Sequence, residues 1–302
     1  MVKNVVVTAA NDAYFNLLEG MVKSYHQNAK RDDTDLCVID LGLTGEQRAR
    51  ISDLVKRFVT VDWDLDFPCL RDAPEYKKAF TLPPFLPKYF GDYETIVWID
   101  ADAWIQTQDG LDIWIEAAKT DKLVMVPELD RSYPSAIAKG KVRTFNNLPM
   151  LNGRVRRISS VQHRKLVQLY NIKIANKSIF QPVLNTGVFA ARTNSTCWEA
   201  WAEAYRIARV RKASNLCDQT PLNYAVYMGM LEVYKLPSIY NWICALAMPV
   251  WDSELRLFVE PLLPHNPIGI VHLVGYSKRE HGEYAKVVDK NGRRANRSLR
   301  FL

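Results

Sequence analysis

The sequence has no long apolar run, few cysteines and no glycine-rich phosphate loop. No stretch approaches the roughly 20 apolar residues of a transmembrane helix, and the first apolar run is broken at Asn11 and Asp12, too early for a secretion signal. The five cysteines are odd in number and form no CxxC pair, which argues against a disulfide framework or a zinc site. Neither GxGxxG nor a Walker-type loop is present. We therefore expect a cytoplasmic protein with reduced thiols.

Acidic residues are also missing from a long central stretch. Residues 131–198 contain 12 Lys/Arg and no Asp/Glu, and residues 273–302 contain 8 basic and 3 acidic residues. Together with a net charge of +7, this distribution indicates an anionic partner, which could be a phosphate, a phospholipid surface or a nucleic acid. The alternative is a basic surface that serves only solubility.

The composition is that of an ordinary globular protein. The 302 residues are 48% hydrophobic and 24% charged, and a chain of this length can form one large domain. In the first 126 residues, β-branched runs alternate with stretches of helical periodicity. We expect strands at residues 3–8, 35–40, 58–61, 95–99 and 122–126, and helices at 14–27, 44–58 and 111–119. This alternation predicts an α/β fold with a mostly parallel sheet flanked by helices.

The pattern is looser after Pro127. We expect a loop at residues 140–152, helices at 159–170, 197–210 and 218–228, and strands at 183–191 and 268–271. Ligands of mostly parallel sheets bind beyond the carboxyl ends of the strands. Residues that directly follow a predicted strand are therefore the first candidates for chemistry.

The strongest local feature is the segment TIVWIDAD, residues 95–102. A hydrophobic strand runs directly into Asp100 and Asp102. Two carboxylates one residue apart at a strand end can share one hard cation such as Mg²⁺ or Mn²⁺, which usually keeps bound phosphates in its coordination shell. The alternative is a solvated loop, because a DxD motif is common by chance.

A candidate third ligand is His272, which also follows a strand and is therefore expected at the same sheet edge. In the segment HLVGYSK, Gly275 allows close approach of a phosphate to the backbone and Lys278 supplies a positive charge. The alternative is a core histidine whose ring nitrogens are satisfied by hydrogen bonds.

These motifs resemble glycosyltransferase family 8, a group of retaining enzymes with the GT-A fold. VTAANDAY resembles the family's nucleotide-binding opening, and WIDAD its metal-binding DxD. LNTGV (residues 184–188), CDQTPLN (217–223) and HLVGYSK (272–278) resemble its FNxGV, DQxxLN and HxxGxxK segments in the same order. The matches span roughly residues 3–278, so we expect a GT-A domain at 1–278 and a basic tail at 279–302.

The resemblance implies a retaining, metal-dependent transfer of a sugar from a UDP-sugar to a glycan, glycolipid or protein acceptor. It implies that Mn²⁺ (or Mg²⁺) is held against the donor diphosphate by Asp100, Asp102 and His272. It implies contacts with that diphosphate from Gly275 and Lys278. It implies contacts with the nucleoside from Ala9, Asn11 and Tyr14, with the Tyr14 ring stacked on uracil.

The resemblance also implies roles near the donor sugar. Asn185 and Asp218 would hydrogen-bond the sugar hydroxyls, and Gln219 would lie beside the anomeric carbon. Lys78 is the candidate for a family Arg/Lys that reaches the donor, although Lys77 fits as well. From the residues alone, Asp218 could instead cap a helix, and Asn185 could instead fix a turn at Gly187.

The chain departs from the family pattern at several positions, as a divergent member of the family would. Asn11 stands where the family often has Asp, Thr220 and Pro221 follow Asp-Gln, and Arg279-Glu280 replaces a frequent Pro-Trp. The basic end carries a few apolar residues, and the resemblance agrees with peripheral binding at the inner face of an anionic membrane. The alternative for this tail is a disordered solubilising segment.

Three competing interpretations remain at the level of sequence. A haloacid-dehalogenase-type phosphatase would use Asp100 as nucleophile, but that motif normally lies near the N-terminus and continues with Thr or Val. A basic nucleic-acid-binding protein lacks support from any zinc-finger, helix-turn-helix or RNP-like signature, so we expect no nucleic-acid partner. A catalytically inactive sugar-nucleotide binder would retain the site without turnover.

Overall fold

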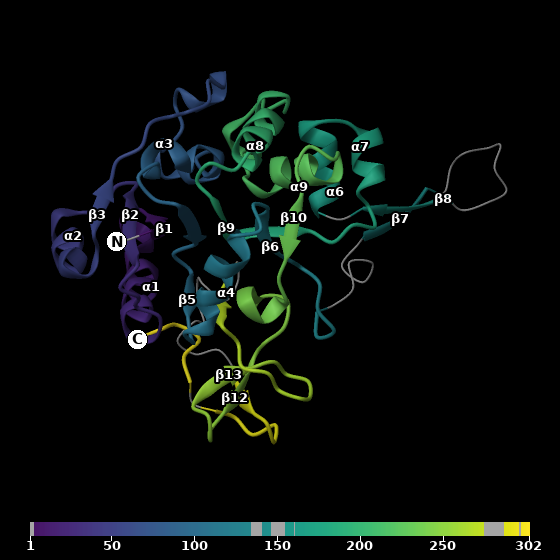
Figure 1. The fold of residues 1–302 in the computed structure, drawn as a ribbon. Coiled ribbons are helices and arrows are strands. Elements are labelled where there is room, and N and C mark those ends of the chain that lie inside the picture. The colour runs from purple at the N-terminus through teal and green to yellow at the C-terminus, as the bar shows by residue number, and fades with distance from the viewer. Residues whose placement is uncertain (1–2, 134–140, 146–154, 160, 275–286, 296) are drawn as a thin grey trace.

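The computed structural model describes residues 3–133, 141–145, 155–159, 161–274, 287–295 and 297–302. A seven-stranded sheet forms its centre, in the order β10-β6-β9-β4-β1-β2-β3 (Figure 1). The strands are β1 (Asn4–Ala10), β2 (Thr34–Asp40), β3 (Arg57–Val59), β4 (Thr95–Ile99), β6 (Leu123–Pro127), β9 (Leu184–Arg192) and β10 (Val233–Lys235). Only β9 runs antiparallel to its neighbours β4 and β6, so the predicted mostly parallel sheet is confirmed.

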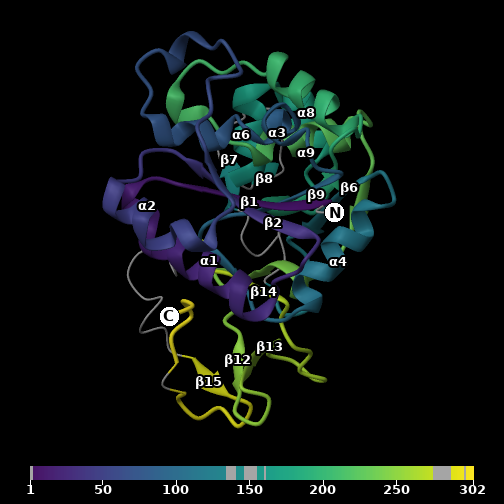
Figure 2. The same cartoon turned by 60° about the vertical axis from the view of Figure 1, so that its left-hand side comes forward.

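Helices cover both faces of this sheet, as Figure 2 shows. The helices are α1 (Phe15–Asn28), α2 (Gly45–Ile51), α3 (Leu86–Phe90), α4 (Asp109–Ala118), α6 (Val161–Leu169), α7 (Ile172–Lys177), α8 (Cys197–Arg206) and α9 (Gln219–Tyr227). In β1, Val6 packs with α1 and α4, whereas Val5 and Val7 pack with α3 and α8. Two apolar layers follow from this alternation, because successive side chains of a strand point to opposite faces.

Several predicted boundaries agree with the structure. Thr44 and Gln47 form the two reciprocal hydrogen bonds of a capping box at the start of α2. The helix ends at Ile51, earlier than expected, and is followed by a short 3₁₀ turn. The predicted loop at residues 140–152 is wrong at its start, because Lys141–Phe145 forms β7 and pairs with β8 (Val155–Ser159). These two strands extend away from the main body in Figure 1.

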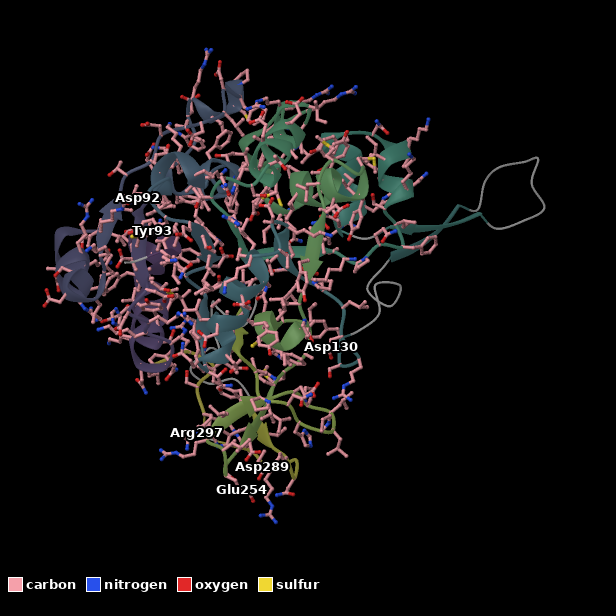
Figure 3. All side chains as sticks on the ribbon, viewed as in Figure 1. Asp92, Tyr93, Asp130, Glu254, Asp289 and Arg297 are labelled. Carbon is pink, nitrogen blue, oxygen red and sulfur yellow. The ribbon has the colours of Figure 1, made fainter. Side chains whose placement is uncertain are left out.

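Two smaller sheets complete the described fold. One joins β11 (Trp242–Ile243), β14 (Ile270–His272) and β5 (Ala103–Ile105), and the other joins β13 (Leu257–Val259), β12 (Val250–Asp252) and β15 (Val288–Asp289). The second of these sheets lies at the lower end of the molecule in Figure 1, where Figure 3 marks Glu254, Asp289 and Arg297. There the Arg297 guanidinium lies 4.5 Å from the centroid of the Trp251 ring.

The last residues of the chain pack against the strand that follows the DxD motif. Leu299 is fully buried, and its carbonyl accepts a hydrogen bond of 2.7 Å from the Trp104 indole. The Phe301 ring lies 5.4 Å from that indole. The predicted boundary at residue 278 itself falls outside the described residues. Among the described helices, none combines the length and apolarity needed to cross a bilayer.

Candidate metal and nucleotide site

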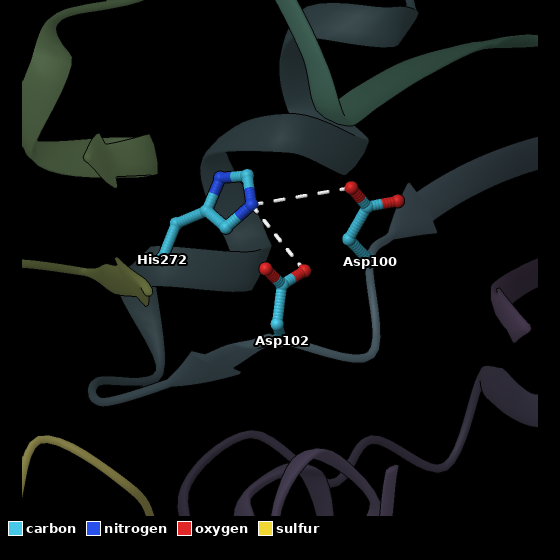
Figure 4. Close-up of side chains that lie close together, drawn as sticks. All are labelled: Asp100, Asp102 and His272. Carbon is cyan, nitrogen blue, oxygen red and sulfur yellow. Dashed lines mark ion pairs between the residues drawn. The ribbon is translucent and has the colours of Figure 1, made fainter. Parts of the chain in front are cut away.

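Three titratable side chains from two distant parts of the chain meet at one edge of the central sheet. Nε2 of His272 lies 3.5 Å from Oδ1 of Asp102 and 3.9 Å from Oδ2 of Asp100. One ligand atom from each residue lies within 4.8 Å of the others (Figure 4). His272 and Asp102 are buried, whereas the Asp100 side chain is 38% exposed. The three residues therefore converge as predicted, but not for the predicted reason, because His272 is the last residue of β14, which belongs to a separate three-stranded sheet.

Strand pairing explains how His272 reaches the carboxylates. After β4, a tight turn closed by the Ala103 amide and the Asp100 carbonyl leads into β5. Strand β14 runs antiparallel to β5 with His272 opposite Ala103. The Leu273 amide then donates to the Asp102 carbonyl at 2.9 Å. The imidazole is thus held beside the DxD turn by backbone hydrogen bonds.

The Asp100 carboxylate is oriented by a neighbour on its own strand. The Trp98 indole donates a hydrogen bond of 2.7 Å to Oδ1 of Asp100, while Oδ2 faces His272. The Trp98 ring itself stacks on Phe189 of β9 at a centroid distance of 5.9 Å. Trp98 was part of the predicted strand, but its role in orienting the carboxylate was not predicted.

Negative charge is concentrated in this small region. Partial burial and the nearby Asp102 carboxylate raise the pKa of Asp100, and His272 opposes this shift. Burial also raises the pKa of Asp218, against a hydrogen bond from Thr186. Two carboxylates and one imidazole nitrogen form a donor set that suits a divalent cation, whose charge would relieve the repulsion between the carboxylates. The residues present therefore fit a divalent metal.

A cavity of about 290 Å³ opens beside the three side chains. Its walls include most of the predicted site residues, namely Ala9, Asn11, Tyr14, Asn185, Asp218 and Gln219, in addition to Asp100, Asp102 and His272. Tyr14 is 37% exposed, so its ring is accessible for stacking. One cavity thus brings together the predicted nucleoside, metal and sugar contacts.

Lys78 does not line the described part of this cavity. Its ammonium group instead donates to the Val61 carbonyl at 2.8 Å and pairs with Glu75. The residue is only 8% exposed and lies in the 3₁₀ helix η4 (Glu75–Phe80). Tyr76 and Phe80 of the same helix do line the cavity. Gly275 and Lys278 lie outside the described residues.

The hydrogen bonds of Asn185 partly support the alternative that this side chain fixes the backbone at Gly187. Its Oδ1 accepts from the Gly187 amide at 2.9 Å, so the side chain does fix the local backbone. Its Nδ2 donates to Glu128 at 3.2 Å and faces Oε1 of Gln219 at 3.5 Å. Asn185 therefore both supports the strand and contacts Gln219 at the cavity wall.

Asp218 stands at the first position before α9 but makes no side-chain capping hydrogen bond. The usual capping hydrogen bond is therefore absent, and the carboxylate instead interacts with Thr186 in the cavity wall and with the backbone of Gln219. Sequence reasoning also missed Asn241, which contacts the His272 ring. A signal for Asn241 was hard to find, because it lies in a short 3₁₀ helix outside every motif identified in the sequence.

Comparison with solved structures identifies the fold as GT-A, the architecture of nucleotide-sugar transferases. The galactosyltransferase LgtC in complex with donor and acceptor sugar analogs is 15% identical, with a TM-score of 0.53 over 90% of this chain and 87% of LgtC. An active-site mutant of LgtC gives 16% identity and a TM-score of 0.52 over the same shares. The bifunctional glycosyltransferase WbbM gives 16% identity and a TM-score of 0.53 over 80% of this chain.

The chain spans 40% of the WbbM chain that it matches. No curated protein sequence matches it. The model of glycosyl transferase family 8 matches residues 5–278, so the chain belongs to this family and is a glycosyltransferase. This assignment replaces the phosphatase interpretation, in which Asp100 would be a nucleophile.

Proposed function

We propose that this glycosyltransferase moves a hexosyl group from a UDP-sugar to a carbohydrate-bearing acceptor, with retention at the anomeric carbon and with Mn²⁺ or Mg²⁺ as cofactor. The acceptor would be a glycan, glycolipid or glycosylated protein. The proposal rests on one observation above all, the convergence of Asp100, Asp102 and His272 on the wall of a cavity at the sheet edge. The LgtC structure with donor and acceptor sugar analogs supports it by similarity of fold.

Different residues of the site would bind different parts of the donor. When bound, the divalent cation would neutralise charge on the leaving diphosphate. Asp100, Asp102 and His272 would hold it, and Mn²⁺ is favoured because an imidazole is a more usual ligand of transition metals than of Mg²⁺. The Tyr14 ring would stack on the base, since it is exposed on the cavity wall, and Ala9 and Asn11 line the same region.

Asn185 and Asp218, which also line the cavity, would hydrogen-bond the sugar hydroxyls, and Gln219 would lie beside the anomeric carbon. Gln219 is a neutral amide and a poor nucleophile. We therefore favour attack of the acceptor oxygen from the leaving-group face. The bond from the anomeric carbon to the diphosphate oxygen breaks, a bond to the acceptor oxygen forms, and the acceptor proton passes to the diphosphate. A trapped glycosyl adduct on Asp218 or Gln219 would overturn this mechanism.

The central experiment is a screen of UDP-sugars for release of UDP in the presence of Mn²⁺, with Asp102→Ala as the control. We expect turnover of at least one UDP-sugar. This turnover should be lost when the metal is chelated and in the Asp102→Ala variant. Binding of UDP-sugars without turnover of any of them would instead indicate an inactive sugar-nucleotide binder. Absence of both binding and turnover would refute the proposed donor class.

We further propose that the basic C-terminal segment binds an anionic membrane surface from the cytoplasmic side. Arg293 and Arg294 are exposed, whereas Leu299 is buried in the fold, so charge can be removed here without removing packed residues. We expect the double variant Arg293→Gln, Arg294→Gln to bind phosphatidylserine vesicles more weakly at low salt. Equal binding by both proteins, or none by either, would refute this role.

A further inference from the structure

The Nδ1 side of the His272 ring faces a buried amide. Nδ1 lies 2.8 Å from Oδ1 of Asn241, while Nε2 faces Asp100 and Asp102. Asn241 is fully buried, and His272 is 2% exposed. The question is which ring nitrogen carries the hydrogen, because only a nitrogen without hydrogen can be a metal ligand.

A backbone amide decides this question. The Gly187 N–H can only donate, and its acceptor is Oδ1 of Asn185 at 2.9 Å. The same oxygen lies 3.0 Å from Asn241, so Asn241 must turn its Nδ2 donor toward it. The opposite end of the Asn241 amide, its oxygen, therefore faces His272. An oxygen at 2.8 Å requires a hydrogen on Nδ1, which in the neutral, metal-binding form of the ring leaves the Nε2 lone pair directed at the two carboxylates.

The ring is also confined from the strand side. A Cβ atom built on Gly187 would lie 2.1 Å from Cε1 of His272, so the ring packs directly on the β9 backbone. Asn241 ends the 3₁₀ helix η7 (Ser238–Asn241), and the following strand β11 pairs with β14 so that Ile243 lies opposite His272. The amide and the imidazole are therefore carried by two directly paired segments.

From this geometry we propose that Asn241 is a positioning residue of the metal site: through Asn185 and the Gly187 amide, it sets the Nδ1–H tautomer and the orientation of His272. The inference rests on the proposed role of His272 as a metal ligand. It adds to the metal site a residue, Asn241, that would contact neither the metal nor the donor. Partners of this kind typically change metal affinity by about 10–100-fold when they are removed.

The first test is Mn²⁺ affinity of the full chain without nucleotide, measured from the free Mn²⁺ signal in electron paramagnetic resonance. Asn241→Leu removes both hydrogen bonds at similar volume and should weaken Mn²⁺ binding by about 10–100-fold. Asn241→Asp keeps an acceptor for Nδ1–H but loses the Nδ2 donor to Asn185, so it should restore only part of this affinity. The matched control is Asn4→Leu, the same change at a buried asparagine whose amide donates to Asp33 and Thr34 at the opposite end of β1.

The second test needs no variant at position 241 and therefore does not depend on whether Asn241→Leu folds. In protein with ¹⁵N-labelled histidine and bound Mg²⁺, long-range ¹H–¹⁵N spectra report which ring nitrogen carries hydrogen. The His272 signals are identified by their loss in His272→Ala. Hydrogen on Nδ1 is the expected result, and hydrogen on Nε2 would overturn the inference.

The outcomes separate this inference from the proposed function. If His272→Ala weakens Mn²⁺ binding but Asn241→Leu does not, the positioning role of Asn241 is wrong and the metal site stands. If neither His272→Ala nor Asp102→Ala changes Mn²⁺ binding, the proposed metal site itself is wrong. Equal weakening by Asn241→Leu and the Asn4→Leu control would reduce the effect to general destabilisation and would also overturn the inference.

Discussion

Gly187→Ala should damage the metal site because the new methyl group would occupy the position of the His272 ring. The added Cβ would lie 2.1 Å from Cε1 and 2.9 Å from both ring nitrogens. Carbon atoms in ordinary contact are about 3.5–4.0 Å apart, so the ring must retreat by about 1.4 Å or the strand must shift. Metal-ligand distances tolerate changes of only about 0.2 Å. We therefore expect Mn²⁺ affinity to fall at least about tenfold, toward that of His272→Ala.

The same substitution should lower stability by about 1–3 kcal/mol, the usual cost of overpacking a filled site. The assay is urea unfolding of a double-mutant cycle that combines Gly187→Ala with His272→Ala. Without the imidazole there is room for the methyl group, and alanine is intrinsically favoured over glycine within a strand by about 0.5–1 kcal/mol. The cost of Gly187→Ala should therefore vanish or change sign in the His272→Ala background.

Two results would refute this reasoning. Wild-type Mn²⁺ affinity in Gly187→Ala would mean that the ring does not need its present position. An equal loss of stability in both backgrounds would mean that the glycine serves the β9 backbone rather than the imidazole.

Three further predictions concern other contacts of the site and of the fold. Trp98→Phe keeps the stack on Phe189 but removes the hydrogen bond to Asp100. Because that carboxylate is 38% exposed, we expect only about a tenfold loss of Mn²⁺ affinity, and unchanged Mn²⁺ binding would contradict this prediction. Tyr14→Ala should weaken UDP binding in calorimetry by about 1–3 kcal/mol, while Tyr14→Phe should not, because stacking needs only the ring; equal effects of the two would argue against stacking. Leu299→Ala should reduce the free energy of unfolding by about 2–5 kcal/mol, since the side chain is fully buried; unaltered urea unfolding would show that the segment is not packed.

Six of the seven strands of the central sheet were predictable because their signals are local, whereas the short edge strand β10 was not predicted. Strand β4 was expected at residues 95–99 and is found there, and the run is bounded by Glu94 and Asp100, which end the hydrophobic pattern. The same logic predicted that Asp100 and His272 meet, but its premise was only half right: Asp100 follows β4, whereas His272 is the last residue of β14 in a separate sheet. What could not be read was the pairing of β14 with β5, which is antiparallel and brings His272 opposite Ala103.

Other parts of the site depend on contacts that no motif encodes. Lys78 was expected to reach the donor from its position before the DxD strand, but its ammonium group bonds to the Val61 carbonyl. The position of Lys78 in the sequence does not determine the direction in which its side chain points. Asn241 was missed for a related reason, since its partner His272 lies 31 residues away and the short strands β11, β12 and β13 between them were not predicted.

The amide contacts also constrain how Asn185 can act in its proposed role at the donor sugar. Its oxygen already accepts from the Gly187 amide and from Asn241, and both donors are buried and cannot be replaced by solvent. Only the Nδ2 side faces Glu128 and Gln219 at the cavity wall. A sugar hydroxyl that contacts Asn185 must therefore accept a hydrogen bond from it. Exchange of this residue for Asp would remove that donor and also place a carboxylate oxygen against Glu128, so Asn185→Asp should impair sugar transfer more than binding of UDP alone.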